Sequence, residues 1–172
     1  MGNLIMLKKL VLTIDSISVK AGKVFSYLLI VVVFSIAYEI VARYFFNSPT
    51  QWASEAMVMG CALFYVIGGA WALYNDRHIK MELLYGKLSN KNKAAVDIIT
   101  SAFFFLYLGM FLYASIKFSW ESILYHETSG SAWNPPIYPI KIAITIGTIL
   151  LILQGIANFI RNLYFFIKGK KI

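Results

Sequence analysis

The stretch YEIVARYFFNSPTQWASE, residues 38–55, joins two long apolar segments. Pro49 interrupts any helix there, because proline has no amide hydrogen and clashes with the preceding turn. The flanking segments are therefore predicted to form a tight antiparallel hairpin. Glu39, Arg43 and Glu55 crowd the same junction. Ionisable residues beside lipid are costly, so they are expected to mark a functional site or a contact with another protein.

Working outward, the chain contains four apolar runs, and 59% of its 172 residues are hydrophobic while 14% are charged. Soluble domains have roughly a quarter of their residues charged. Each run reaches the roughly 20 residues that a helix needs to cross a bilayer. The sequence therefore predicts an all-α integral membrane protein, one membrane domain over residues 1–172. Its four transmembrane helices are predicted at about 24–46, 53–74, 94–118 and 137–166.

The first 23 residues are predicted to form an amphipathic helix that lies in the membrane interface. One face is apolar and repeats at helical spacing: Leu7, Leu10, Val11, Ile14, Ile17 and Ala21. The other face is polar: Lys9, Thr13, Ser16, Lys20 and Lys23. A cleaved signal peptide is not expected, because the first apolar run leads into Glu39 without a cleavage site of small residues.

The net charge of +8 is concentrated before the first run, in the loop 75–93 and after the last run. Arg43, Lys117 and Lys141 are the basic residues that lie toward the opposite ends of the helices. The positive-inside rule therefore predicts that both termini and the loop 75–93 are cytoplasmic, and that the loop 119–136 is periplasmic. The basic residues are expected to meet membrane lipid, and no nucleic-acid partner is predicted.

The central parts of the four runs contain no Asp, Glu, Lys, Arg or His. Carriers and proton relays usually place such residues or broken helices near the bilayer midplane. The ionisable side chains are instead near the external ends, and they are candidates for a subunit interface or for ion pairs within the hairpins: Glu39, Arg43, Glu55, Lys117, Glu121 and Lys141. Glu39 with Arg43, and Lys117 with Glu121, have the i,i+4 spacing of intrahelical pairs. Pairing within the chain, contact with another subunit and a transported-solute site all remain open at this point.

Two further sets of residues are candidates for contacts. The residues of the external loops could form a periplasmic docking surface, although tryptophans there also fit an interfacial belt: Asn47, Trp52, His126, Glu127 and Trp133. Small residues that let helices approach closely could pack within the chain or against a partner helix: Gly60, Gly68, Gly147 and Gly155.

The sequence offers no enzyme site. Cys61 is the single cysteine, and both histidines, His78 and His126, fall in predicted loops rather than in helices where they could bind haem. There is no phosphate-binding glycine loop and no cluster with metal-ligand spacing. No catalytic, metal or cofactor site is therefore predicted in this chain.

An ordered set of motifs over nearly the whole chain resembles the small membrane subunit of TRAP (tripartite ATP-independent periplasmic) transporters, the DctQ-like family. The motifs are Glu39-x3-Arg43-Tyr44-x-Phe46-Asn47-x-Pro49-x2-Trp52-x2-Glu55, Gly68-Gly69-Ala70, His78-Ile79-x-Met81-Glu82, Ser131-x-Trp133-x-Pro135-Pro136-x2-Pro139-x-Lys141, Gly147 and Leu153-Gln154-Gly155. The family often has paired acids where this chain has Ser54-Glu55, and Asp where it has Glu82. The first departure weakens any role that needs two adjacent carboxylates.

The resemblance implies a three-part importer in the bacterial inner membrane. A periplasmic binding protein captures an organic acid, such as a dicarboxylate, a keto acid or sialic acid. A large membrane subunit holds the substrate and Na+ sites and moves as an elevator, while the small subunit enlarges the static scaffold and helps to dock the binding protein. Two rivals remain: a self-sufficient small carrier that dimerises, and a membrane assembly or scaffold protein without a transport role.

Overall fold

The computed structural model describes residues 2–75 and 88–170, and in these residues the chain is helical apart from its connections. The helices are α1 (Gly2–Ser26), α2 (Leu28–Tyr44), α3 (Ala53–Tyr74), α5 (Asn90–Leu124) and α6 (Tyr138–Lys168). Four stretches are long and apolar enough to cross a membrane, with α1 and α2 counted together as Ile5–Tyr44. The predicted all-α membrane fold is confirmed. The short helix that Leu83, Leu84, Tyr85 and Leu88 suggest, and the motif from His78 to Glu82, lie mainly outside the described residues.

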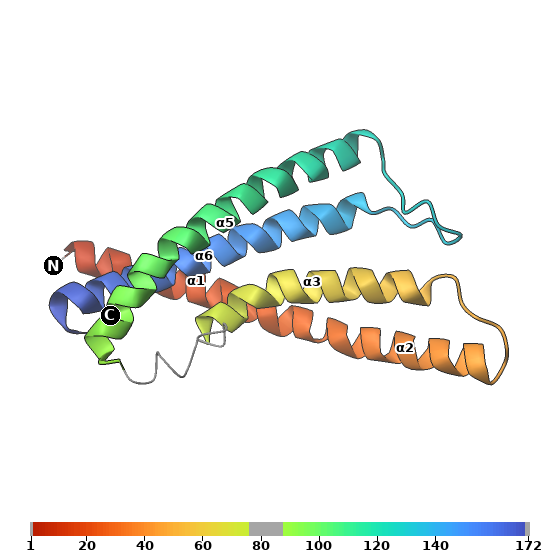
Figure 1. Cartoon of the computed structure of the whole chain (residues 1–172), viewed down its shortest axis with the longest axis horizontal. Helices are drawn as coiled ribbons and strands as arrows, with labels where there is room; N and C mark the ends of the chain where they lie inside the picture. The colour runs from red at the N-terminus through yellow and green to blue at the C-terminus, as the bar shows by residue number, and fades with distance from the viewer. Residues whose placement is uncertain (1, 76–87, 171–172) are drawn as a thin grey trace.

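The long helices lie side by side in one open layer (Figure 1). α2 packs against α3, α3 against α6, and α6 against α5, so α2 and α5 form the two edges. α5 has 35 residues and α6 has 31. At 1.5 Å per residue, both exceed the roughly 30 Å of a hydrocarbon core. They therefore extend past α3, which has 22 residues.

The layer has two distinct ends. At one, which we call the terminal end, both chain termini lie; at the other, the loop end, residues 45–52 connect α2 to α3 and residues 125–137 connect α5 to α6 (Figure 1). The predicted hairpin at Pro49 is present. α2 ends at Tyr44, and Asn47 follows in the left-handed conformation, with a positive φ of 48°, before Pro49. Asparagine tolerates this left-handed conformation better than most residues.

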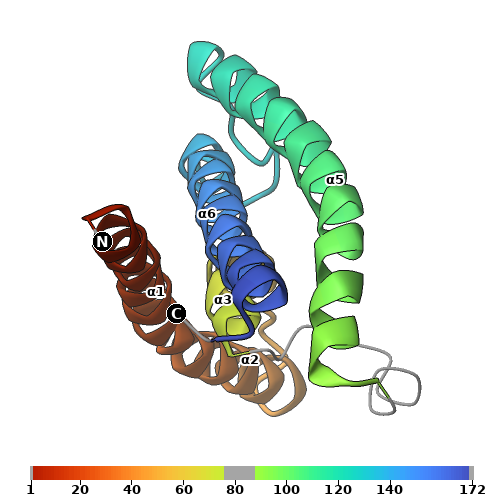
Figure 2. The ribbon, with the colours of Figure 1, turned by 90° about the vertical axis from the view of Figure 1, so that its left-hand side faces the viewer.

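α1 and α2 form one nearly continuous rod that bends at Tyr27 (Figure 2). The backbone of Tyr27 stays helical, with φ −65° and ψ −22°. The amide of Tyr27 bonds to the carbonyl of Val24 at 3.3 Å, and the amide of Ile30 to the carbonyl of Tyr27 at 3.1 Å. These i→i−3 bonds tighten the turn. The N-terminal helix thus runs past the predicted limit at residue 23 and continues into the first span.

α1 packs against α3 and α6 through a face that only partly matches the predicted apolar face. The buried stripe contains Val11 and Ile14 of that face, together with Asp15, Ser18 and Gly22. Leu10 and Ile17 remain exposed, as does the predicted polar face with Lys9 and Lys20. The cause is the close approach of α1 to α3, since a Cβ at Gly22 would lie 2.3 Å from the Cβ of Trp71.

Three of the four glycines predicted to pack helices do so. A Cβ at Gly60 would lie 2.5 Å from Cγ2 of Val32, and one at Gly147 would lie 2.7 Å from Cγ1 of Val66. At Gly155 it would lie 2.3 Å from Cε1 of Phe104. These glycines join α3 to α2, α6 to α3 and α6 to α5, so they set the spacing of the layer. Gly68 differs, because a Cβ there would meet nothing closer than 3.9 Å.

Candidate functional site

Glu39 fastens the first loop to α2 at the loop end. Its Oε1 accepts hydrogen bonds from Nε of Arg43, at 2.9 Å, and from Nη2. Its Oε2 accepts bonds from the amide of Thr50, at 2.9 Å, and from the Thr50 hydroxyl. The side chain of Glu39 is only 14% exposed, whereas that of Arg43 is 52% exposed. The predicted Glu39–Arg43 pair therefore forms, and its carboxylate also closes the hairpin across Pro49.

The second loop begins with a capped helix end. The amide of Glu127 bonds to the carbonyl of Ser122 at 3.0 Å, and the amide of His126 to the carbonyl of Ile123 at 3.2 Å. This pair of bonds is a Schellman motif, with His126 in the left-handed position at φ 45°. The His126 ring lies edge-on to Tyr138, with ring centres 6.2 Å apart. His126 therefore has a structural role in this turn.

Glu127 and Lys141 join the end of the second loop to the first turn of α6. The Lys141 ammonium donates a hydrogen bond to Oε2 of Glu127 and forms an ion pair with it. This hydrogen bond lowers the pKa of the Glu127 carboxyl from its ordinary value of 4.5. Lys141 is a predicted interface residue and Glu127 a predicted docking-surface residue, and the structure brings the two together.

The second loop is closed on itself by backbone and side-chain bonds. The amide of Ser129 bonds to the carbonyl of Pro135, and the amide of Ile137 to the carbonyl of Glu127, both at 3.0 Å. Inside this ring, Oδ1 of Asn134 accepts a bond from the amide of Gly130 at 3.0 Å. The loop is therefore a compact unit that holds Trp133 at the loop end.

A cavity of about 540 Å³ lies where the two loops meet. Its lining includes Trp52 from the first loop, Trp133 from the second, and Tyr38 from α2. Trp52 stacks on Tyr38 with ring centres 6.0 Å apart. Two residues predicted for a docking surface are thus brought to one cavity, although they are 81 positions apart in the chain. Asn47, His126 and Glu127 do not line it.

The remaining candidates lack such partners. Lys117 and Glu121 are both exposed on α5, and no ion pair joins them in the part of the chain that the structure describes, so the predicted i,i+4 pair does not form. Glu55 lies in the first turn of α3, where the helix dipole favours an anion. Its Oε2 is buried without a hydrogen-bond partner among residues 2–75 and 88–170.

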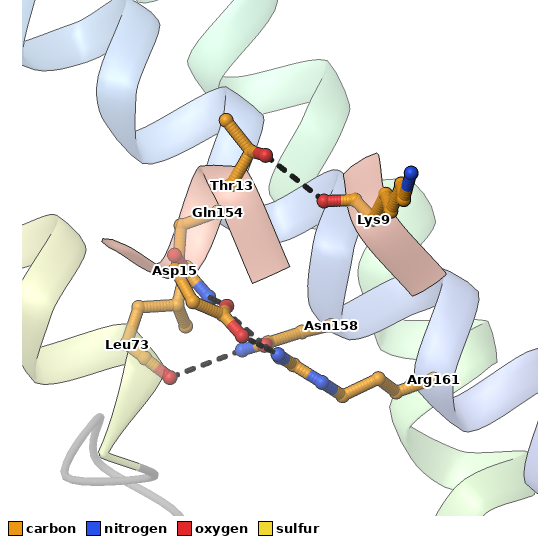
Figure 3. A network of polar contacts seen from close by, with 7 residues as sticks. All are labelled: Lys9, Thr13, Asp15, Leu73, Gln154, Asn158 and Arg161. Atoms are coloured by element: carbon orange, nitrogen blue, oxygen red, sulfur yellow. Dashed lines mark hydrogen bonds and ion pairs between the residues drawn. The ribbon is translucent and has the colours of Figure 1, made fainter. Parts of the chain in front are cut away.

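A second polar site lies at the terminal end and was missed in the sequence. Asp15 of α1, only 6% exposed, faces α6 (Figure 3). Its Oδ1 accepts a bond from Nε2 of Gln154 at 3.0 Å, and its Oδ2 forms an ion pair with Nη2 of Arg161. Thr13, on the same helix, bonds only to the carbonyl of Lys9 one turn earlier.

Asn158 extends this site to α3. Its Oδ1 accepts a bond from Nη1 of Arg161 at 2.9 Å, and its Nδ2 donates to the carbonyl of Leu73 at 3.0 Å. That carbonyl is among the last four of α3, which have no partner within their own helix. We call Asp15, Gln154, Asn158 and Arg161, with the Leu73 carbonyl, the Asp15 network. It joins three helices that are far apart in the sequence.

Two signals in the sequence point to the Asp15 network. Asp15 is the only acidic residue before position 39. Gln154, Asn158 and Arg161 have the i, i+4, i+7 spacing of one helix face. The acid on α1 and the polar face of α6 could have been paired on charge alone.

The polar side chains at both ends make contacts within the chain. No group of three or more His, Cys, Asp and Glu side chains that could hold a metal ion occurs among the described residues. The polar side chains bind helix ends, loops and one another. The arrangement provides two bonded loops at the loop end, a cavity with aromatic walls and two apolar edges.

Comparison with known families agrees with this arrangement. The model of the family described as tripartite ATP-independent periplasmic transporters, DctQ component, matches residues 27–164. Among curated proteins, no match was found. The family match includes both loops of the loop end, α3, α5 and nearly all of α6, and it begins at the bend between α1 and α2. The chain therefore belongs to the DctQ component family of tripartite ATP-independent periplasmic transporters.

Proposed function

We propose that the chain is the small scaffold subunit of a sodium-coupled TRAP transporter. In this proposal the transporter imports an organic acid, such as a dicarboxylate, a keto acid or sialic acid, which a periplasmic binding protein delivers. The observation that carries the proposal is the open layer of helices, whose edges α2 and α5 expose large apolar side chains along their length. Such extended apolar surfaces in a membrane protein suit lipid or a partner subunit.

The proposed partner at these edges is the large membrane subunit, in a stable heterodimer. It would hold the substrate and Na+ sites, because the central parts of the spans in this chain contain no ionisable side chain. Among the predicted interface charges, Lys117, Glu121 and the buried oxygen of Glu55 have no internal partner in the described residues. They are our candidates for ion pairs across the interface. Arg43 could contribute as well, since half of its side chain is exposed.

The proposed docking surface for the binding protein is the cavity between the two loops. Trp52 and Trp133 provide large, stiff aromatic surfaces of the kind that dominate protein interfaces. The distribution of basic residues supports an orientation in which the loop end is periplasmic and both termini are cytoplasmic, in the bacterial inner membrane. The basic terminal end would then meet anionic lipid.

The test is co-expression of the chain with a candidate large membrane subunit, followed by purification and uptake in proteoliposomes. We expect a stable complex, and uptake that requires both a Na+ gradient and the binding protein. Lys117→Glu should weaken co-purification without disturbing the internal contacts of the chain, because Lys117 has none of the described ion pairs. Reversal of the charge at Arg43 should also weaken co-purification, but through loss of the Arg43–Glu39 ion pair inside the chain.

The rival functions predict different results in the same experiment. Uptake by this chain alone would identify a self-sufficient carrier. A stable complex whose uptake does not change when this chain is removed would identify an assembly factor. Failure of the chain to purify with any membrane subunit would refute the scaffold proposal.

A further inference from the structure

The Asp15 network joins a helix outside the family match to residues inside it. The match begins at residue 27, so α1 and Asp15 lie outside it, while Gln154, Asn158 and Arg161 lie inside it. α1 is thus bonded to residues of α6 that the family match covers. We propose that Asp15 and Arg161 are positioning residues which fix α1 across α6 and α3, and that α1 in this fixed position is needed for stable assembly with the large subunit.

The first argument is the chemistry of the Asp15 carboxylate. Each oxygen has its own partner on α6, Gln154 for one and Arg161 for the other. Burying a charged group is costly unless it is paired and hydrogen-bonded, and removal of one partner from such a pair is strongly destabilising. The position of α1 in which both oxygens are bound is therefore favoured over positions in which α1 slides or rotates.

The Asp15 network also has a fixed orientation. The Arg161 guanidinium binds Asp15 with one amino group and Asn158 with the other, so its plane is set by two partners. Asn158 in turn binds the Leu73 carbonyl at the end of α3. Arginine presents a rigid fork of donors, which lysine cannot reproduce. The network therefore defines the position of α1 relative to two helices at once.

Apolar contact between α1 and α6 alone defines the position of α1 on α6 poorly. The buried cluster between α1 and α6 is small: Val11, Ile14 and Ala157, with Leu153 and Ile160 beside it. In lipid, apolar side chains gain little by leaving the bilayer for a helix interface, so polar contacts and close packing decide the geometry. α1 packs more extensively on α3, most closely where the backbone at Gly22 meets Trp71, and this contact acts together with the bonds to α6.

The link to assembly rests on the proposed scaffold function. α1 continues through Tyr27 into α2, which is an edge of the layer. A change in the position of α1 would therefore alter the surface that the α1–α2 rod presents to a partner. A loosely held α1 would add an entropic cost to binding, because it would have to be ordered in the complex.

The position of α1 can be measured in the subunit alone. Spin labels at two exposed positions, Ser16→Cys on α1 and Leu163→Cys on α6, are introduced with Cys61→Ser, and their distance distribution is measured by double electron–electron resonance in nanodiscs. We expect one narrow peak in the parent and loss of that peak in Asp15→Asn. Arg161→Lys should give a broader peak than the parent. The matched control is Lys8→Gln, which removes an exposed charge from the same helix and should leave the peak unchanged.

The exchange variant, Asp15→Arg with Arg161→Asp, makes the test independent of folding defects. Recovery of the narrow peak, or of folded protein where Asp15→Asn alone does not accumulate, supports the proposal. An unchanged peak in Asp15→Asn, or equal loss in the single and exchange variants, overturns it.

The second measurement is co-purification with the large subunit. We expect a severalfold loss in Asp15→Asn and recovery in the exchange variant. Loss of the narrow peak without any loss of assembly would overturn the assembly step. Failure of the parent chain to bind a large subunit would instead refute the scaffold function, and the distance measurements would still stand.

Discussion

Glu39 binds Thr50 twice, through the amide and the hydroxyl, across the turn that contains Pro49. The same carboxylate binds Arg43 through its other oxygen. One side chain of α2 thus binds the end of its own helix and the loop that leads to α3. The hairpin needs such a bond, because the residues of the turn at 45–52 pair little with one another.

Glu39→Gln is therefore expected to loosen the first loop. The amide side chain loses the ion pair with Arg43, and it can accept only weaker hydrogen bonds from Thr50. Hydrogen exchange in a peptide that covers residues 45–52 should become roughly tenfold faster, because the Thr50 amide opens more often. Glu121→Gln is the control, since Glu121 is exposed and takes part in none of the described ion pairs. Equal exchange in Glu39→Gln and the parent would show that the carboxylate does not hold the loop.

Gly147→Ala is expected to destabilise the layer, whereas Gly68→Ala should not. A Cβ at position 147 would overlap Cγ1 of Val66 and approach the Val66 backbone carbon to 3.2 Å, so the helices must separate. Overpacking of this kind costs about 1–3 kcal/mol. At position 68 the nearest atom is 3.9 Å away, and alanine has the higher helix propensity. Thermal unfolding in one detergent measures the stability of both variants and of the parent. Equal melting temperatures for Gly147→Ala and the parent would contradict the close packing at Gly147.

Much of the fold follows from local properties of the sequence. Length and hydropathy predict each span, and Pro49 predicts the first turn, because these signals act within a few residues. The Glu39–Arg43 pair is also local, since its spacing is one helical turn. Lys117 and Glu121 have the same spacing but stay apart, because two exposed long side chains gain little from pairing in high dielectric.

The rest depends on how helices meet, and hydropathy does not encode that. The buried face of α1 contains Asp15 and Ser18, because a polar partner on α6 makes burial of the charge favourable. A pattern search for an apolar face finds the buried Val11 and Ile14, but it also selects Leu10 and Ile17, and both of these are exposed. The cavity between Trp52 and Trp133 requires the folded path of both loops, so no spacing in the sequence predicts it.

Acid is expected to open the second loop. The Lys141 bond lowers the pKa of Glu127, so the charged form is favoured in the folded chain. Its contribution to stability is complete above the ordinary pKa of 4.5 and is lost as the pH falls through the lower, folded value. Hydrogen exchange in residues 127–137, corrected for intrinsic rates, should be constant from about pH 7 to pH 5 and should increase below about pH 4.5.

Lys141→Gln is the companion test of that bond. Without the ammonium, the Glu127 pKa should return toward its ordinary value, and the acid transition should move to higher pH. The variant should also show faster exchange in residues 127–137 at neutral pH. A transition at the same pH in both proteins would show that another group controls the loop.

Trp133→Ala and Trp52→Ala are expected to weaken binding of the periplasmic binding protein in the proposed transporter. Each removes an aromatic wall of the same cavity, and aromatic anchors at interfaces are often worth about 2 kcal/mol or more. The dissociation constant should therefore rise roughly 30-fold. Trp120→Ala is the control. Trp120 is an exposed tryptophan at the loop end of α5, and it does not line the cavity. Titration of the binding protein onto the complex in nanodiscs measures all three variants.

Since the two tryptophans share one cavity, the double variant should lose less than the sum of the two single losses in binding free energy. Additive losses, or an equal loss in Trp120→Ala, would rule out the cavity as a single docking site.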